Sequence, residues 1–394
     1  MSAPPDSTPS PPEPKRILFL TGTRADFGKL MLLMRAVRAH PDYQCEIFVT
    51  GMHTLKVYGN TVNEIYKAGF KDEVHVYMNQ HLDEPMEMVL ANTIQGLSRY
   101  IHEQCPDLVV IHGDRVEALA GAIAGTFSNT LVCHIEGGER SGTVDEIIRH
   151  AVSKLSHLHF VANDEARTRL LQMGECDESV TVIGSPDIDV MMSDLLPRIE
   201  KTLARYEIGF DDYGIVLFHP VTTEVDDMQR YAEQFVDALM ASERNYVVIY
   251  PNNDEGASHI LRAYERLEGN PRFRVFPSIG FEHFLTLLKH TRFIIGNSSA
   301  GVREAPVYGV RTINVGTRQH GRFESSSVTN TPYETEAIVE TIRKIAAMDG
   351  RAERSLHFGR GDSVVRFMEA IAEPDFWETS RQKNFRDIAL ALES

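Results

Sequence analysis

Short apolar runs alternate with amphipathic stretches along the first half of the chain. The apolar runs predict buried strands, and the stretches between them have the spacing of helices that cover a core. Strands that alternate with helices favour βαβ units and a parallel sheet. The predicted strands are residues 16–21, 45–50, 74–77, 108–112, 131–135, 157–161 and 180–183. The predicted helices between them include residues 29–39, 85–103, 116–126, 145–155 and 164–173.

The alternation breaks near residues 184–186 and resumes after a mainly helical connector that contains Pro197. The pattern therefore predicts an α/β protein with two doubly wound, Rossmann-like domains that face a cleft, residues 15–190 and residues 205–373. The strands predicted in the second domain are residues 215–218, 246–250, 274–276, 293–295 and 312–315.

The two ends of the chain fall outside these domains. Residues 1–14 are too rich in proline to pack, and we expect them to be disordered. Residues 374–394 have a helical pattern with no strand to follow it. Hydrophobic residues make up 42% of the chain and charged residues 24%, which is typical of soluble globular proteins.

The formal net charge of -16 argues against non-specific binding to nucleic acid. A few local arginines, histidines and backbone N–H groups could still hold a diphosphate. No apolar run approaches the roughly 18 residues of a membrane span. No secretion signal is visible at the N-terminus, and we expect a cytoplasmic protein without a membrane partner. The four cysteines are widely spaced, and the 16 histidines include no HExxH pair, so no metal is expected.

Two carboxylates follow neighbouring predicted strands. Asp114 comes after residues 108–112, and Glu136 comes directly after residues 131–135. Ligands of open α/β sheets bind outside the carboxyl ends of the strands, so these acids are candidates for proton transfer. Asp114 could instead cap the next helix, and Glu136 could form a structural ion pair with an arginine such as Arg115.

A third candidate acid lies at the start of the helix predicted over residues 145–155. Glu146 would be catalytic if its side chain turned towards Glu136. Acids in the first turn also suit the helix dipole, and that effect alone would explain both Asp145 and Glu146.

Two segments at strand ends are candidates for binding an anion. Residues 21–28 follow the first strand and open a helix. There the guanidinium group of Arg24 could donate two hydrogen bonds to a phosphate. This segment matches neither GxGxxG nor a P-loop, and a purely structural turn is the alternative. His219 ends the first strand of the second domain and could donate to a diphosphate or act as an acid, unless it is a packed loop residue.

The clearest phosphate-binding pattern is residues 296–306. Small residues follow a strand and open a helix, so free N–H groups and hydroxyls can surround a phosphate. Glu304 is placed to accept hydrogen bonds from ribose hydroxyls. Residues 316–322 add Arg318 and Arg322 after the next strand. The ligand-binding candidates in residues 296–306 are Asn297, Ser298, Ser299, Gly301 and Glu304.

Six of these segments occur in an order that resembles a known family. They are residues 21–29, 112–115, 134–139, 141–146, 218–224 and 296–306. From about residue 15 to its end, the chain is similar to the hydrolysing UDP-N-acetylglucosamine 2-epimerases that make N-acetylmannosamine for bacterial sialic acid, a component of capsules.

The resemblance implies a fold like that of GT-B glycosyltransferases, with residues 374–394 as a helix that crosses back to the first domain. It implies that the cleft holds the substrate and that the chain forms a homodimer or a dimer of dimers. Arg115 stands where many non-hydrolysing relatives carry a small hydroxyl residue, which is consistent with the hydrolysing branch. The implied UDP-binding residues are Arg24, His219, Ser298, Ser299 and Glu304, with Phe284 near uracil. The implied catalytic acids are Asp114, Glu136 and Glu146.

The reaction implied by the resemblance is anti elimination of UDP to 2-acetamidoglucal, followed by addition of water. It yields UDP and N-acetylmannosamine without a redox change, so no NAD or other cofactor is expected. Three alternatives stay open. The sugar could be of the bacillosamine type and feed legionaminic acid, the epimerase could be non-hydrolysing, or the protein could be a GT-B-type glycosyltransferase or a nucleotide-sugar sensor.

Overall fold

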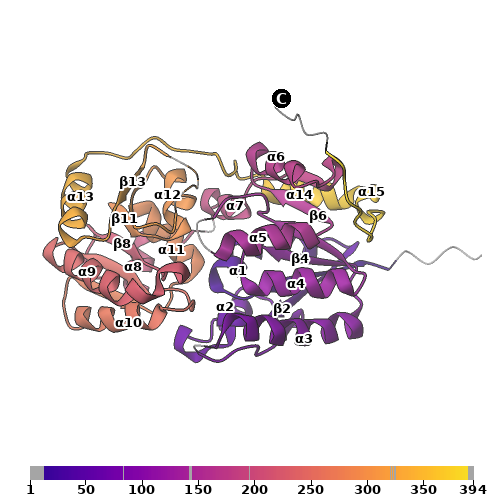
Figure 1. Ribbon diagram of the computed structural model, residues 1–394, viewed down its shortest axis with the longest axis horizontal. Coiled ribbons are helices and arrows are strands. Elements are labelled where there is room, and N and C mark those ends of the chain that lie inside the picture. The colour runs from indigo at the N-terminus through magenta and orange to yellow at the C-terminus, as the bar shows by residue number, and fades with distance from the viewer. Residues whose placement is uncertain are drawn as a thin grey trace, which may run out of the picture.

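The computed structural model describes residues 13–388, apart from residues 83, 142, 143, 195, 320, 322 and 324. Two parallel sheets, each covered by helices, form two domains side by side (Figure 1). In the described residues, no helix combines the length and apolar character needed to cross a membrane. Residues 1–12, on which most of the predicted disorder of residues 1–14 falls, lie outside the described residues.

The first domain is built on a seven-stranded sheet in the order β3-β2-β1-β4-β5-β6-β7. Its strands are β1 (Lys15–Thr21), β2 (Tyr43–Val49), β3 (Val74–Val76), β4 (Leu108–His112), β5 (Leu131–Ile135), β6 (Leu158–Val161) and β7 (Val180–Val182). Its helices are α1 (Arg24–Ala39), α2 (Val62–Lys67), α3 (Met86–Gln104), α4 (Val116–Phe127), α5 (Val144–Leu155) and α6 (Asp164–Gln172). The strands are apolar because helices cover both faces of a parallel sheet.

The second domain is built on a six-stranded sheet in the order β10-β9-β8-β11-β12-β13. Its strands are β8 (Gly214–Leu217), β9 (Tyr246–Ile249), β10 (Phe273–Phe276), β11 (Phe293–Gly296), β12 (Arg311–Val315) and β13 (Val328–Thr331). Its helices are α9 (Met228–Ala241), α10 (Ala257–Tyr264), α11 (Phe281–His290), α12 (Glu304–Val307) and α13 (Thr335–Ala347). Helices α7 (Pro186–Met192) and α8 (Ile199–Arg205) connect the domains.

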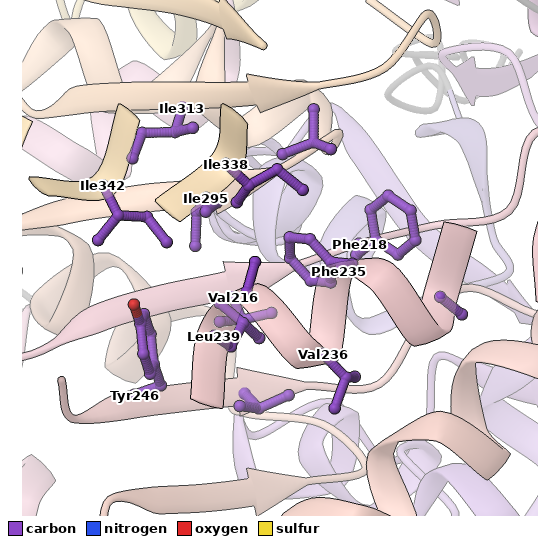
Figure 2. Packing of buried hydrophobic residues seen from close by; sticks show 14 of the residues in the cluster. Val216, Phe218, Phe235, Val236, Leu239, Tyr246, Ile295, Ile313, Ile338 and Ile342 are labelled. Atoms are coloured by element: carbon purple, nitrogen blue, oxygen red, sulfur yellow. The ribbon is translucent and has the colours of Figure 1, made fainter. Parts of the chain in front are cut away.

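The core of the second domain fixes the end of strand β8. Figure 2 shows Val216 and Phe218 packed among side chains of α9, with Tyr246 of β9, Ile295 of β11 and Ile313 of β12. The ring of Phe218 stacks on that of Phe235, with centroids 4.5 Å apart. Phe218 is fully buried and therefore held in place. It fixes the direction in which the next residue, His219, leaves the strand.

In both sheets the strand order reverses beside the first strand, between β1 and β4 and between β8 and β11. A crevice opens at such a switch point, outside the carboxyl ends of the strands. The two-domain α/β fold predicted from the sequence is confirmed, and each predicted strand is present to within two residues at its ends. Strand β13 was not predicted, because its sequence Val-Thr-Asn-Thr is polar and it pairs only at the edge of the sheet.

The crossing to the first domain begins earlier than the predicted helix at residues 374–394. Helix α14 (Ser363–Ala372) already packs on the first domain, where Phe367 contacts Phe160 of β6 and the helix lies against α1. Both oxygens of Asp189 in α7 accept N–H groups from the first turn of α14.

The helical prediction for residues 374–394 was wrong over most of the described part of that segment. Helix α15 covers only Pro374–Trp377, and residues 378–388 are not helical. Contacts with the first domain replace helical hydrogen bonds there. Lys383 Nζ lies 2.6 Å from Glu175, and His157 Nε2 lies 3.1 Å from the Arg381 carbonyl oxygen. Residues 389–394 lie outside the described part of the chain.

Candidate active site between the two domains

A cavity of about 320 Å³ opens between the domains at the carboxyl ends of both sheets. The strand register explains why the two predicted acids meet there. His112 of β4 lies opposite Ile135 of β5, so the loops that follow both strands leave the sheet at the same edge. The first-domain wall includes Arg24, Lys29, His112, Asp114, Arg115, Glu136, Asp145 and Arg149. The second-domain wall includes His219, Asn252, Phe281, Phe284, Ser298, Ser299, Arg303, Glu304 and Arg318.

Glu136 has an unusual backbone conformation. Its φ is 65°, in the left-handed region that residues other than glycine rarely adopt. Its N–H donates to the carbonyl of Phe160 at 2.9 Å, which holds the turn in place. Strained residues of this kind concentrate at functional sites. The Glu136 side chain lines the cavity between the domains.

The Glu136 carboxylate is buried among basic side chains. One oxygen lies 2.7 Å from an Arg303 nitrogen, and the other lies 3.1 Å from His112 Nε2. Lys29 Nζ is 3.9 Å away, and the Ser185 hydroxyl donates to the same carboxylate. Burial alone would raise the pKa of Glu136, but Arg303, Lys29 and His112 outweigh it and hold the pKa well below its usual value. Glu136 is therefore ionised, as a proton acceptor must be.

Arg149 ties the two acid loops together. Its guanidinium donates to the Asp114 carboxylate and, over 2.5 Å, to the Glu136 carbonyl. The Ser141 hydroxyl donates to the same Asp114 oxygen at 3.2 Å. Arg149 is itself buried, so it links the Asp114 carboxylate firmly to the backbone of the Glu136 loop.

The structure places Asp145 on the cavity wall and Glu146 away from it. Arg318 lies 3.1 Å from an Asp145 oxygen, across the domain boundary. Glu146 instead accepts the Ser141 N–H and lies 2.9 Å from His150 Nε2. Successive residues of an α-helix point about 100° apart, and the cavity lining includes Asp145 but not Glu146. The interpretation of Glu146 as a cavity acid is therefore corrected to Asp145.

His219 is held from three directions. Its N–H donates to Asn297 Oδ1 at 2.7 Å, and its carbonyl accepts from Asn297 Nδ2 at 2.9 Å. Its Nδ1 accepts the Asn252 N–H at 3.0 Å, which leaves the proton of the neutral ring on Nε2. Burial, together with Arg318 and Arg115, lowers the pKa of His219 well below its usual value. His219 is therefore a neutral N–H donor at the cavity.

Two predicted ligand residues do not line the cavity. Asn297 is buried behind His219 and fixes its backbone. A Cβ on Gly301 would lie 2.6 Å from the Thr312 methyl, so this glycine allows the turn to pack on β12. Ser298 and Ser299 do line the cavity, and Arg318 joins them there. Arg322 lies outside the described residues.

The turn that begins α1 uses its own backbone donors. The Gly22 and Thr23 N–H groups donate to Asp26 at 3.0 and 2.8 Å, within a capping box. These N–H groups are therefore not available to an anion. The cation that this segment presents to the cavity is Arg24, which lies 3.6 Å from Glu64.

A family model described as UDP-N-acetylglucosamine 2-epimerase matches residues 35–372. The chain belongs to this family. A UDP-N-acetylglucosamine 2-epimerase of Neisseria meningitidis serogroup B is 50% identical over 379 residues, which cover 95% of this chain and 100% of the relative. A UDP-N,N'-diacetylbacillosamine 2-epimerase (hydrolyzing) of Legionella pneumophila is 34% identical over 362 residues, which cover 91% and 95%. The resemblance of the six sequence segments to UDP-N-acetylglucosamine 2-epimerases is confirmed.

The epimerase fold is also found among solved structures. The crystal structure of a Methanocaldococcus jannaschii UDP-GlcNAc 2-epimerase in complex with UDP-GlcNAc and UDP aligns with a TM-score of 0.75 at 17% identity. The alignment covers 91% of this chain and 99% of that one. At this identity the likeness concerns the fold, and it agrees with the two-domain arrangement described above.

The epimerase cavity contains a buried charge cluster that sequence analysis missed. Lys29 Nζ lies 3.1 Å from Glu304 and 3.2 Å from Asp187, in addition to its contact with Glu136. Burial would lower the pKa of Lys29, but the three carboxylates outweigh it and the pKa is raised. Burial raises the pKa of Glu304, an effect that Lys29 opposes. Lys29 thus joins Glu136 on the first-domain wall of the cavity to Glu304 of α12.

The cluster forms because α1 approaches the second domain closely. A Cβ on Gly28 would lie 2.3 Å from the Phe281 ring, so only glycine permits this contact. The approach brings Lys29, the next residue, to α12. In the sequence, Lys29 directly precedes the apolar residues 30–34. That position is the one local indication that Lys29 could be buried.

Proposed function

We propose that this protein is a hydrolysing 2-epimerase that converts UDP-N-acetylglucosamine and water to N-acetylmannosamine and UDP. The observation that carries the proposal is the composition of the interdomain cavity. Its first-domain wall presents Asp114, Glu136 and Asp145, and its second-domain wall presents a neutral histidine and a small-residue turn before α12. Proton-transfer groups thus face a diphosphate-binding surface across one cavity.

The chemistry of the sugar explains why both walls are needed. The C2 proton beside an acetamido group is only feebly acidic, so direct deprotonation would be slow. Departure of UDP from C1 makes an oxocarbenium-like centre that acidifies the C2–H bond. Anti elimination then gives 2-acetamidoglucal, and water adds across the double bond with the opposite configuration at C2. The site must supply a base, an acid on the other face and donors for the leaving diphosphate.

The described residues can be assigned to these tasks. Asp114, Glu136 and Asp145 serve proton removal and return. His219, with a proton on Nε2, and the turn at Ser298 and Ser299 hold the diphosphate. Arg24, Arg115 and Arg318 add positive charge at the cavity. Phe284 also lines the cavity, and we assign it to packing against the uracil ring.

Glu304 is assigned to the ribose. One of its oxygens contacts Lys29, and the other has no hydrogen-bond partner among the described residues. A carboxylate oxygen held in this way is suited to accept from a hydroxyl. Closure of the domains keeps bulk water away from the glycal until hydration.

We assign UDP-N-acetylglucosamine as the substrate because the more similar of the two relatives is named for that sugar. The Neisseria meningitidis epimerase at 50% identity is named for UDP-N-acetylglucosamine, whereas the Legionella pneumophila relative named for the diacetylbacillosamine sugar is 34% identical. The latter name also specifies hydrolysis, which supports a hydrolysing branch that includes both sugars. The homodimer, the cytoplasmic location and the role in sialic acid synthesis stay predictions.

Product analysis tests the proposal. We expect the purified protein to release free UDP and free N-acetylmannosamine in equal amounts from UDP-N-acetylglucosamine, as measured by anion-exchange chromatography of the nucleotide and the sugar. UDP-N-acetylmannosamine without free UDP would instead indicate a non-hydrolysing epimerase. Release of UDP only from the diacetylbacillosamine sugar would assign the protein to that substrate, and transfer to an acceptor would identify a glycosyltransferase.

A further inference from the structure

A chain of polar side chains, of which Arg115 lines the cavity, links the first domain to the second. Glu117, in the first turn of α4, has a carboxylate oxygen 3.2 Å from Arg115 Nε. A terminal nitrogen of Arg115 donates to Asn253 Oδ1 in the second domain at 2.9 Å. Asn253 Nδ2 in turn donates to Gln80 Oε1 of the first domain at 3.0 Å. Arg115 is therefore held from its own domain and from the opposite one.

Glu117 is enclosed by backbone. Its exposed fraction is 2%, and its other carboxylate oxygen has no hydrogen-bond partner among the described residues. A Cβ on Gly51 would lie 2.5 Å from this oxygen, and a Cβ on Gly22 would lie 2.8 Å from the carboxyl carbon. The two glycines thus leave just enough room for the side chain. Burying a charge in this way is costly unless a cation compensates, and Arg115 is the cation in contact.

A simpler explanation is that Glu117 only stabilises the helix dipole of α4. An exposed acid in the first turn would do this without the cost of burial. Glu87, the second residue of α3 as Glu117 is of α4, is such an exposed acid. The burial of Glu117 therefore requires another reason, which the position of Arg115 supplies.

Arg115 faces the part of the cavity assigned to the diphosphate. It lines the same wall as Asp114, and its charge acts on His219. A guanidinium has five N–H donors in a fixed plane, and Glu117 and Asn253 account for two nitrogens at one side of it. With Nε and one terminal nitrogen held, the plane cannot rotate, and the remaining donors keep one direction.

We propose that Glu117 is a positioning residue, which fixes Arg115 so that its remaining donors meet the diphosphate as it leaves. The proposal rests on the proposed function and adds to it a residue that does not line the cavity. Negative charge on the diphosphate grows as the C1–O bond breaks, so a well-oriented cation acts more strongly in the transition state than in the substrate complex. Loss of Glu117 should therefore lower kcat more than it raises KM.

A double-mutant cycle tests whether Glu117 affects turnover through Arg115. The variants are Glu117→Gln, Arg115→Met and the double variant, with Glu117→Asp as the conservative change and Glu87→Gln as the matched helix-position control. Turnover is followed by UDP release, and UDP affinity is measured separately by calorimetry. We expect Glu117→Gln to lower kcat about tenfold with KM changed less than about threefold. The double variant should match Arg115→Met, and Glu117→Asp should recover part of the loss.

Three results would overturn the inference. Additive losses in the double variant would show that Glu117 acts independently of Arg115. Tighter UDP binding by Glu117→Gln would show that the carboxylate competes with the diphosphate. An equal loss in Glu87→Gln would assign the effect to helix stability.

A further variant, Arg115→Lys, covers the case in which Glu117→Gln does not fold. Arg115→Lys keeps the charge but lacks the Nε–H that Glu117 holds, so kcat should again fall about tenfold. Wild-type turnover in Arg115→Lys would overturn the inference. A wild-type protein that neither binds nor releases UDP would instead contradict the proposed function itself, which the cycle does not test.

Discussion

Asp114→Asn and Glu136→Gln should each lower kcat by about 10³-fold while UDP binding stays within a few fold of wild type. Both carboxylates lie on the first-domain wall, whereas the groups assigned to UDP lie mainly on the second-domain wall. Removing one proton-transfer group therefore stops the chemistry and leaves the nucleotide contacts in place. Steady-state kinetics and calorimetry with UDP measure the two effects separately.

Glu146→Gln is the matched control for these variants. Glu146 belongs to the same acidic motif, but the structure turns it away from the cavity towards His150. We expect its turnover to stay within about threefold of wild type, since it is a half-exposed residue whose carboxylate, among the described residues, contacts Ser141 and His150 and not the cavity lining. Circular dichroism should show that all three variants fold. Loss of UDP binding in both Asp114→Asn and Glu136→Gln would contradict the catalytic assignment.

Lys29→Met should have the largest effect on stability, a loss on the order of 3–5 kcal/mol. The substitution keeps an unbranched side chain that is shorter by the terminal nitrogen, and it leaves Glu136, Asp187 and Glu304 without their shared buried cation. UDP affinity should also fall, because Lys29 holds Glu304 at the site assigned to the ribose. Urea unfolding followed by circular dichroism measures the stability, and calorimetry measures the affinity.

Lys67→Met provides the comparison for Lys29→Met. Lys67 forms an exposed ion pair with Glu64 at 3.1 Å, so its loss should change the free energy of unfolding by less than about 1 kcal/mol. The double variant Lys29→Met with Asp187→Asn should recover part of the stability, because it removes one of the unpaired charges. Wild-type stability in Lys29→Met would show that the cluster does not depend on this cation.

The fold followed from the sequence because buried parallel strands are continuous apolar runs with recognisable ends. Asp114 and Glu136 were predicted for the same reason, since the position of a residue directly after such a strand fixes the edge at which it lies. The polar edge strand β13 lacked this pattern. The helix predicted at residues 374–394 was wrong because contacts with the first domain, such as that of Lys383 with Glu175, hold that segment in another conformation.

The rest of the site depends on features that local pattern does not contain. Asp145 and Glu146 are adjacent acids, and only the rotation of α5 decides which one faces the cavity. Lys29, Asp187 and Arg303 come from three helices or turns far apart in the sequence, and they meet because the domains close on each other. Gly28 is the one sequence feature that could have indicated this approach, since its missing side chain permits the contact with Phe281.

The central claim is that the reaction breaks the C2–H bond and hydrolyses the link to UDP. Proton NMR of the wild-type protein with UDP-N-acetylglucosamine in D2O tests both parts together. We predict free UDP and N-acetylmannosamine that carries deuterium at C2. Free N-acetylglucosamine that keeps its C2 proton would show simple hydrolysis and would contradict the account, as would a UDP-linked product.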